Sequence, residues 1–192
     1  MRMQPDVLTP GAQRVLDAAS RLFYGNGIHA VGVDAIAAEA GVTKKTIYDR
    51  FGSKEALVAA YLRARDRRFR AFLTGYVAAR GDDPAGQLVD AFDALAAWSD
   101  EESPRGCSFV NAHAELPDPR HEGHRAIVEQ KRWMTGFFAE RARAAGLPDP
   151  DSVADDLMLL YDGALVTRGM NTVEDAFARA RRIAEGIVSR AA

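Results

Sequence analysis

Hydrophobic residues recur along most of the chain at spacings of three and four, which is the period of an α-helix with one buried face. No segment shows the strict alternation and hairpin turns of paired strands. The first predicted helix covers residues 9–24, with Thr9 as N-cap and Pro10 at the first helical position. Its apolar face comprises Ala12, Val15, Leu16, Ala19, Leu22 and Phe23. The pattern therefore predicts an all-α protein.

Short helices are expected next, over residues 33–40 and 44–50, separated by a turn at Gly41, where glycine tolerates a left-handed conformation. Thr43 and Ser53 are suited to cap the helices that follow them. The helix that begins at residue 53 continues to about residue 80.

Loop signals rich in Pro, Gly and Asp separate five further predicted helices. These cover about residues 84–99, 106–115, 119–145, 149–168 and 172–190, which gives about nine helices in total. We expect a small three-helix domain over residues 1–52 and a larger helical domain over residues 53–192, with the helix of residues 53–80 as connector.

The stretch "GVTKKTIYDRFGSKEAL", residues 41–57, carries three of the four lysines of the chain. A short helix, a three-residue turn with glycine and a second short helix form a helix-turn-helix, which places its second helix in the major groove of DNA. Val42, Ile47 and Phe51 are expected to hold that helix against the core. Lysines on a short exposed helix are often only a solvated face, but the turn, the two caps and the anchor spacing favour DNA binding.

The polar residues of this stretch suit contacts with a polyanion, because Lys, Thr and Tyr reach base edges or phosphates and helix N-termini present free N–H groups. The predicted DNA-binding residues are Thr43, Lys44, Lys45, Thr46, Tyr48, Arg50 and Lys54. Charge agrees with this placement. Residues 1–70 hold 12 Lys+Arg against 7 Asp+Glu, a formal +5, and residues 71–192 hold 13 against 20, a formal −7.

The segment "VGVDAIAAEAGVTKKTIYDRFGSKEALVAAYL", residues 31–62, resembles the tetracycline-repressor (TetR) family of bacterial transcriptional regulators. The resemblance implies a three-helix DNA-binding domain, a helical ligand-binding domain and a homodimer. It also implies that residues 44–50 form the recognition helix. Gly32 and Asp34 depart from the family pattern, in which a threonine or a basic residue is frequent at the start of the preceding helix. A carboxylate there would repel phosphate and could accept from a cytosine amino group, so we leave Asp34 out of the contact set.

Residues 105–138 resemble the start of the ligand domain in one branch of this family. Aromatic side chains with a few polar atoms suit a site for an apolar small molecule. The candidates are Trp98, Phe109, Val110, His113, Trp133, Phe137 and Tyr161. The alternative is that these side chains fill the core, as helical aromatics do more often.

The last two predicted helices carry apolar stripes that suit a dimer interface of four helices, two from each subunit. The candidate residues are Leu157, Leu160, Ala164, Leu165, Phe177, Ala180, Ile183, Ala184 and Ile187. The alternative is that the stripes pack within one chain.

We predict neither a metal site nor a cofactor. His121 and His124, in "HEGH", are three residues apart rather than the four of zinc proteases, and no further ligand is evident. Cys107 is the single cysteine, a redox switch if a neighbour such as Arg105 lowered its pKa and otherwise a small buried residue. No apolar run is long enough to span a bilayer, and the start lacks the apolar stretch of a signal peptide, so we expect a cytoplasmic protein with no membrane partner.

These features together predict a ligand-responsive repressor that binds a palindromic operator in double-stranded DNA as a homodimer and is released by a small-molecule effector. One alternative is an architectural DNA-binding protein without a ligand. Another is an all-α enzyme that uses His113, Glu115, His121 and His124, which no nucleophile, phosphate loop or metal spacing supports.

Overall fold

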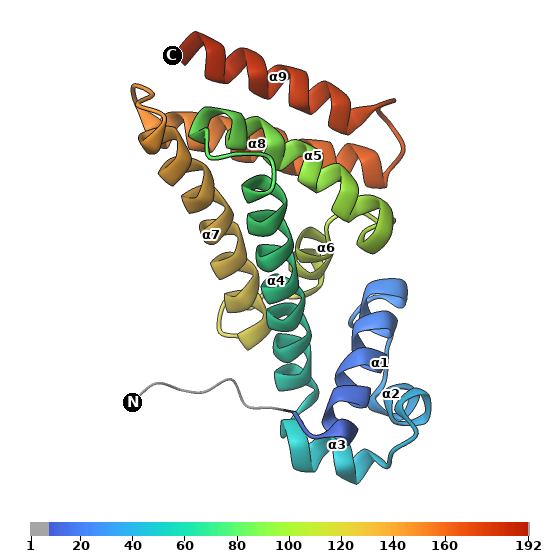
Figure 1. Cartoon of the computed structure of the whole chain (residues 1–192). Coiled ribbons are helices and arrows are strands. Elements are labelled where there is room, and N and C mark those ends of the chain that lie inside the picture. Colours follow the sequence, from blue (N-terminus) through green and yellow to red (C-terminus); the bar gives the residue numbers. More distant parts are fainter. Residues whose placement is uncertain (1–7, 192) are drawn as a thin grey trace, which may run out of the picture. The chain divides into compact units, whose positions relative to one another are not determined.

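The computed structural model describes residues 8–191, and over that range the chain folds into nine α-helices without a β-strand (Figure 1). The helices are α1 (Pro10–Asn26), α2 (Val33–Ala40), α3 (Lys44–Phe51), α4 (Lys54–Ala78), α5 (Pro84–Glu102), α6 (Ser108–Glu115), α7 (Glu122–Ala144), α8 (Pro150–Gly169) and α9 (Ala176–Ala191). The prediction of an all-α fold with about nine helices is confirmed. The first seven residues of the predicted N-terminal domain and the last residue of the chain lie outside the described range.

Three helix starts are fixed by hydroxyl caps where the sequence placed them. Thr9 Oγ1 accepts from the N–H of Ala12 at 3.4 Å, and Thr43 Oγ1 accepts from the N–H of Thr46 at 3.2 Å. Ser53 Oγ accepts from the N–H of Ala56 at 3.0 Å. Each cap satisfies a backbone donor that the first helical turn leaves unpaired.

Three helices begin two or more residues later than the pattern predicts. The helix α7 begins at Glu122 instead of residue 119. The helix α6 begins at Ser108 instead of residue 106, because Gly106 adopts a φ of +78° and lies against α8. A Cβ placed on Gly169 would come within 2.8 Å of the Gly106 Cα, so a side chain at Gly169 would clash with this backbone. The helix α9 begins at Ala176 instead of residue 172, because Asn171 and Asp175 both have a φ of +53°.

The chain forms two compact units. The first unit contains the described residues up to Ala64 and the segment Phe109–Ile127, and the second contains Arg65–Ser108 and the described residues from Val128 onward. The first unit therefore holds more than the 52 residues expected for the N-terminal domain. The physical reason is packing: Leu57 and Val58 of α4 are buried, and the ring of Tyr61 lies 5.8 Å from that of Phe23 in α1.

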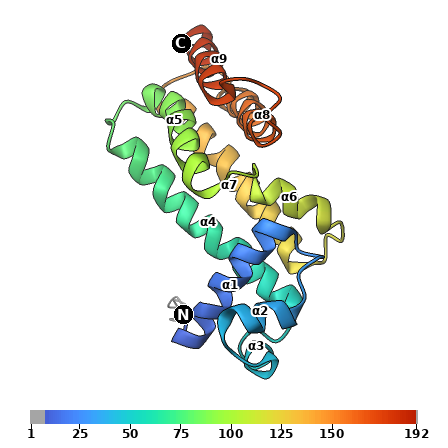
Figure 2. The ribbon, with the colours of Figure 1, turned by 90° about the vertical axis from the view of Figure 1, so that its right-hand side faces the viewer.

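In the first unit, α2 packs on α1 and α3 packs on both (Figure 2). Val15, Ile36 and Ile47, one from each helix, have no exposed surface. Because α2 and α3 have only eight residues each, they are too short to be stable in isolation. Burial against α1 and against each other therefore holds them in place.

In the second unit, α9 packs on both α5 and α8, and α8 and α9 lie side by side (Figure 2). An aromatic cluster fills its interior, in which the ring centroids of Phe92 and Phe138 are 6.1 Å apart and those of Phe138 and Tyr161 are also 6.1 Å apart. Among the described residues, no helix is both long enough and apolar enough to cross a membrane.

The predicted dimer contacts divide into two groups. Five of them are buried inside the chain and belong to the core of the second unit: Leu157, Ala164, Leu165, Ala180 and Ala184. Because α8 and α9 use these small and apolar faces to pack with each other and with α5, the five side chains are not available to a partner. Leu160, Phe177 and Ile187 are half-buried, and Ile183 is 52% exposed.

Candidate nucleic-acid interface

The turn between α2 and α3 is closed by backbone hydrogen bonds. The N–H of Gly41 donates to the carbonyl of Ala38 at 3.2 Å, and the N–H of Val42 donates to the carbonyl of Ala37 at 3.0 Å. Gly41 has a φ of +63°, which favours glycine because it has no Cβ. The turn fixes the direction in which α3 leaves α2, as a helix-turn-helix requires.

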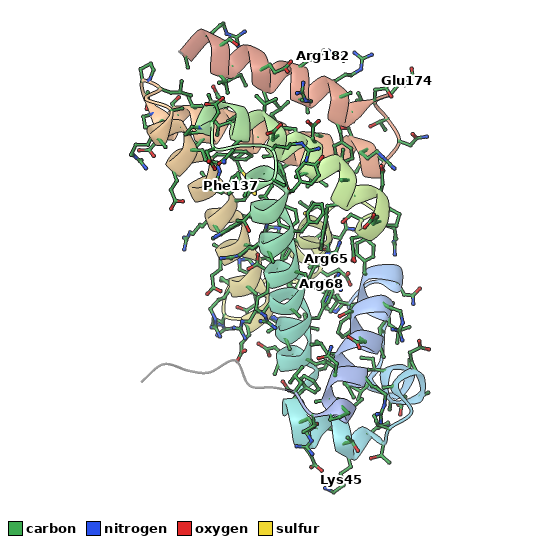
Figure 3. All side chains as sticks on the ribbon, viewed as in Figure 1. Lys45, Arg65, Arg68, Phe137, Glu174 and Arg182 are labelled. Carbon is green, nitrogen blue, oxygen red and sulfur yellow. The ribbon has the colours of Figure 1, made fainter. Side chains whose placement is uncertain are left out.

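The helix α3 has one buried anchor and a broad exposed face. Ile47 is fully buried, while Val42 and Phe51 are half-buried, so the anchoring expected from three apolar residues rests mainly on Ile47. Lys44, Lys45, Tyr48 and Arg50 are exposed. Figure 3 shows Lys45 projecting outward from α3.

Both lysines of α3 are already paired with carboxylates. Lys44 Nζ lies 2.6 Å from Asp34 Oδ1 of α2, and Lys45 Nζ lies 2.6 Å from Asp49 Oδ2 one turn further along α3. Sequence reasoning left Asp34 out of the site, and the fold brings it to Lys44, the first residue of α3. The i, i+4 spacing of Lys45 and Asp49 can be recognised in the sequence of a helix. The contact between Lys44 and Asp34 forms only because the turn brings α2 and α3 together.

Thr43, Thr46 and Lys54 have more constrained positions than the other predicted contacts. The hydroxyl of Thr43 caps α3 and lies 3.0 Å from the hydroxyl of Thr46, which is half-buried. Lys54 is the first residue of α4 and is half-buried. Thr43 and Thr46 therefore have a structural role at the start of α3, and Lys54 is partly covered at the start of α4.

A cavity of about 440 Å³ lies within the first unit, beside Lys54. Its lining residues are Ile28, His29, Lys54, Glu55, Val58, Glu115, Leu116, Pro117, Asp118 and His121. This volume is within the range of small-molecule sites in proteins. None of the seven residues predicted to line a ligand pocket lines this cavity, which sequence reasoning missed because its walls come from separate parts of the chain.

Two carboxylates that line this cavity form hydrogen bonds to other segments of the first unit. Glu115, at the end of α6, accepts from the N–H of Ile28 at 2.9 Å and from the N–H of His29 at 2.7 Å in the loop between α1 and α2. Glu55, in the first turn of α4, accepts from the N–H of Glu122 at 3.1 Å, at the start of α7. Hydrogen bonds to charged groups are among the stronger ones in proteins, so these two acceptors hold the segment of residues 109–127 to the loop between α1 and α2 and to the start of α4.

The predicted ligand-pocket residues fall in both units. Phe109, Val110 and His113 belong to the first, and Trp98, Trp133, Phe137 and Tyr161 belong to the second. Phe109, Phe137 and Tyr161 are buried, and the rings of Phe137 and Phe138 meet edge to face at 5.7 Å. These three side chains act as core.

The remaining candidates have more exposed surroundings. The rings of Trp133 and Phe137 are 5.8 Å apart, and the Arg70 guanidinium lies 4.6 Å from the centre of the Trp133 ring. The guanidinium groups of Arg65 and Arg68, labelled in Figure 3, lie within 6 Å of the Trp98 ring. Both tryptophans thus stack with arginines.

Cys107 is buried beside Lys131, whose Nζ lies 3.6 Å from the sulfur, whereas the sequence suggested Arg105 as the cationic neighbour. Lys131 also pairs with Asp162. Burial lowers the pKa of Lys131, but the neighbouring Cys107 and Asp162 raise it, and the net shift is upward. Burial raises the pKa of the nearby Tyr161 well above its ordinary value.

The four histidines do not gather into one site. The rings of His113 and His124 are 5.3 Å apart, while the Nδ1 of His121 lies 2.9 Å from the N–H of Gly123, which donates to it. Across the described residues, no group of three or more metal-ligating side chains is found.

Comparison with known proteins places these features in context. Residues 15–61 match the family model described as bacterial regulatory proteins, tetR family. SCO4454, a TetR-family transcriptional regulator from Streptomyces coelicolor, is 33% identical, and the match covers 94% of this chain and 95% of that protein with a TM-score of 0.87. The repressor ComR of Escherichia coli is 29% identical over 160 residues, which are 79% of this chain and 76% of ComR.

A short part of the chain is similar to a further regulator at higher identity. The HTH-type transcriptional regulator Rv1255c of Mycobacterium tuberculosis is 44% identical over 57 residues. That match covers 30% of this chain and 28% of the length of Rv1255c. Identity is thus higher over this short match than over the longer match to ComR.

Proposed function

Because the chain belongs to the tetR family of bacterial regulatory proteins, which are DNA-binding transcriptional regulators, we propose that it is a repressor released from its operator by a small molecule. The observation that carries the proposal is the exposed surface of α3. This surface carries Lys44, Lys45, Tyr48 and Arg50, and the buried Ile47 anchors the helix. Lysine, arginine and tyrosine supply the hydrogen-bond donors that base edges and phosphates accept.

The proposed repressor acts as a homodimer on a palindromic operator. One recognition helix reads only a few base pairs, whereas a two-fold dimer presents two of them about 34 Å apart, or a multiple of that. Exposed apolar side chains on α8 and α9 support a partner surface there. Leu159 is 75% exposed and Ile183 is 52% exposed, and burying them would stabilise a dimer.

The cavity beside Lys54 supports a response to a small molecule. A ligand there would contact Glu55 and Glu115, the two carboxylates that hold residues 109–127 to α4 and to the loop that leads into α2. To shift a protein from 1% to 99% in one conformation, a ligand must prefer that conformation by about 5.5 kcal/mol. The half-buried Trp98 and Trp133 of the second unit are the other candidate contacts for an effector.

The test is a selection of random duplex DNA by the purified protein, followed by binding measurements on the enriched sequence. We expect a palindrome with two short half-sites. The affinity should fall steeply with salt, at about 0.9 logarithmic units per logarithmic unit of salt for each phosphate neutralised. The double variant Lys44→Ala, Lys45→Ala should weaken operator binding at least about tenfold while its melting temperature stays near that of the wild type.

Three outcomes would contradict the proposal. A flat salt response would exclude binding dominated by phosphate contacts. Equal binding of all duplexes would favour the architectural alternative. A large loss of stability in the lysine variant would show that these side chains support the fold instead of the DNA contact.

A further inference from the structure

The exposed face of α2 and α3 carries an ion pair that joins the two helices of the helix-turn-helix. Asp34 is the second residue of α2, and its carboxylate lies 2.6 Å from Nζ of Lys44, the first residue of α3. The Asp34 side chain is 76% exposed and the Lys44 side chain 53% exposed, so both face a molecule that docks on α3. The pair presents an acceptor and a donor side by side.

Charge is balanced in the segment that contains α2 and α3. Residues 33–55, from the start of α2 to the first turn of α4, contain four basic side chains and four acidic ones. Asp49 pairs with Lys45 on the same helix, so both lysines of α3 have a carboxylate next to them. Each pair lowers the positive charge that a phosphate meets at that lysine, because binding to phosphate depends on uncompensated positive charge. The paired lysines are therefore better suited to base edges, and the phosphate contacts fall to the other donors of this surface, such as Arg50 and Lys54.

The pair is complementary to one base pair in particular. In the major groove a G·C pair presents the O6 and N7 acceptors of guanine on one side and the N4 amino donor of cytosine on the other. Lysine pairs with the guanine acceptors, and aspartate accepts from cytosine N4. An A·T pair places its single donor between two acceptors and adds the thymine methyl, so a lysine meets one acceptor where guanine offers two.

We propose that Asp34 and Lys44 together read one G·C base pair in each half-site, with Lys44 donating to guanine and Asp34 accepting from cytosine. The inference rests on the proposed function and adds a specificity-determining residue to it. Asp34 acts in two ways. It holds the Lys44 ammonium in place before DNA arrives, and it penalises any base pair that turns an acceptor toward its carboxylate.

The experiment compares the wild type with Asp34→Asn by random-duplex selection and by competition between the selected site and sites changed at one base pair. The wild type should require G·C at one position of each half-site, with about a tenfold loss of affinity for A·T there. Asparagine offers both a donor and an acceptor, so the variant should lose most of that preference. Its binding to unrelated duplexes should increase, because one negative charge is removed from the surface.

Glu39→Gln is the matched control. Glu39 is also an exposed carboxylate of α2, but its partner is Arg21 of α1 at 2.9 Å, so its removal should leave the base preference unchanged. Melting curves of both variants check that the fold is intact. A wild-type protein that enriches no sequence would overturn the proposed function and this inference with it. A specific wild type whose base preferences are all retained in Asp34→Asn would overturn the inference alone.

Discussion

At the scale of single residues, the side chains that hold α3 in place differ from those proposed to contact DNA. Ile47 of α3 is fully buried, while its neighbour Tyr48 is 47% exposed. An eight-residue helix has little stability of its own, so the energy that keeps α3 folded comes from the buried side. The two positions should therefore respond differently to substitution.

We expect Ile47→Ala to lower the free energy of unfolding by about 2–4 kcal/mol, because it removes buried methyl groups and leaves a cavity. In a chain of this size that corresponds to a fall in melting temperature of roughly 5–15 °C. Tyr48→Phe is the matched control and should leave the melting temperature unchanged while weakening operator binding. Equal melting curves for Ile47→Ala and the wild type would show that α3 is held by other contacts.

At the scale of elements, Glu115 connects segments that are far apart in the chain. Its carboxylate accepts two backbone N–H groups in the loop between α1 and α2, 86 and 87 residues away. Gly27, next to this loop, has a φ of +92° and would bring a Cβ to 3.2 Å from the Glu115 Oε1. Loop and carboxylate therefore fit closely, and Glu115 ties the end of α6 to the start of the helix-turn-helix.

Glu115→Gln should weaken this connection, because a neutral amide oxygen is a poorer acceptor than a carboxylate. Hydrogen exchange is the direct measurement: the backbone N–H groups of Ile28 and His29 should exchange faster in the variant. We also expect a loss of about 1 kcal/mol in stability. The exposed Glu101, changed to Gln, is the control and should alter neither quantity. Unchanged exchange at Ile28 and His29 would argue against the role assigned to Glu115.

The sequence predicts the elements well where the signal is local. Caps such as Thr9, Thr43 and Ser53 identify helix starts because the hydroxyl and the N–H that it accepts lie within one turn. The late start of α9 was missed because the left-handed backbone at Asn171 and Asp175 leaves no local apolar pattern. The cavity beside Lys54 and the Asp34 contact depend on packing between separated segments, which periodicity does not reveal.

At the scale of the whole molecule, the spacing of apolar residues along a helix does not distinguish residues of the core from residues of a dimer interface. Leu157 and Ala184 fit the predicted dimer pattern, yet they are fully buried within one chain. The side chains left for a partner are those that the fold exposes, such as Leu159 on α8 and Ile183 on α9. A dimer that uses these helices therefore buries the outer faces of α8 and α9.

We expect the wild type to be a dimer and the double variant Leu159→Glu, Ile183→Glu to be a monomer, because burying two carboxylates at an apolar interface is costly. Sedimentation or light scattering at micromolar concentrations measures the mass. Ala178→Glu adds one charge to an exposed position of α9 and should leave the dimer intact. A monomeric wild type at these concentrations would contradict the homodimer.

The distribution of lysines has a practical consequence. Three of the four, Lys44, Lys45 and Lys54, belong to the proposed DNA surface, and the fourth, Lys131, is paired with Asp162 and lies beside the buried Cys107. Reagents that attack side-chain amines would therefore modify the protein mainly where DNA must dock. Amine coupling to a biosensor chip would block the activity under study, so the duplex should be immobilised instead. Conversely, protection of Lys44 and Lys45 from acylation would report operator occupancy by mass spectrometry, with little background from the rest of the chain.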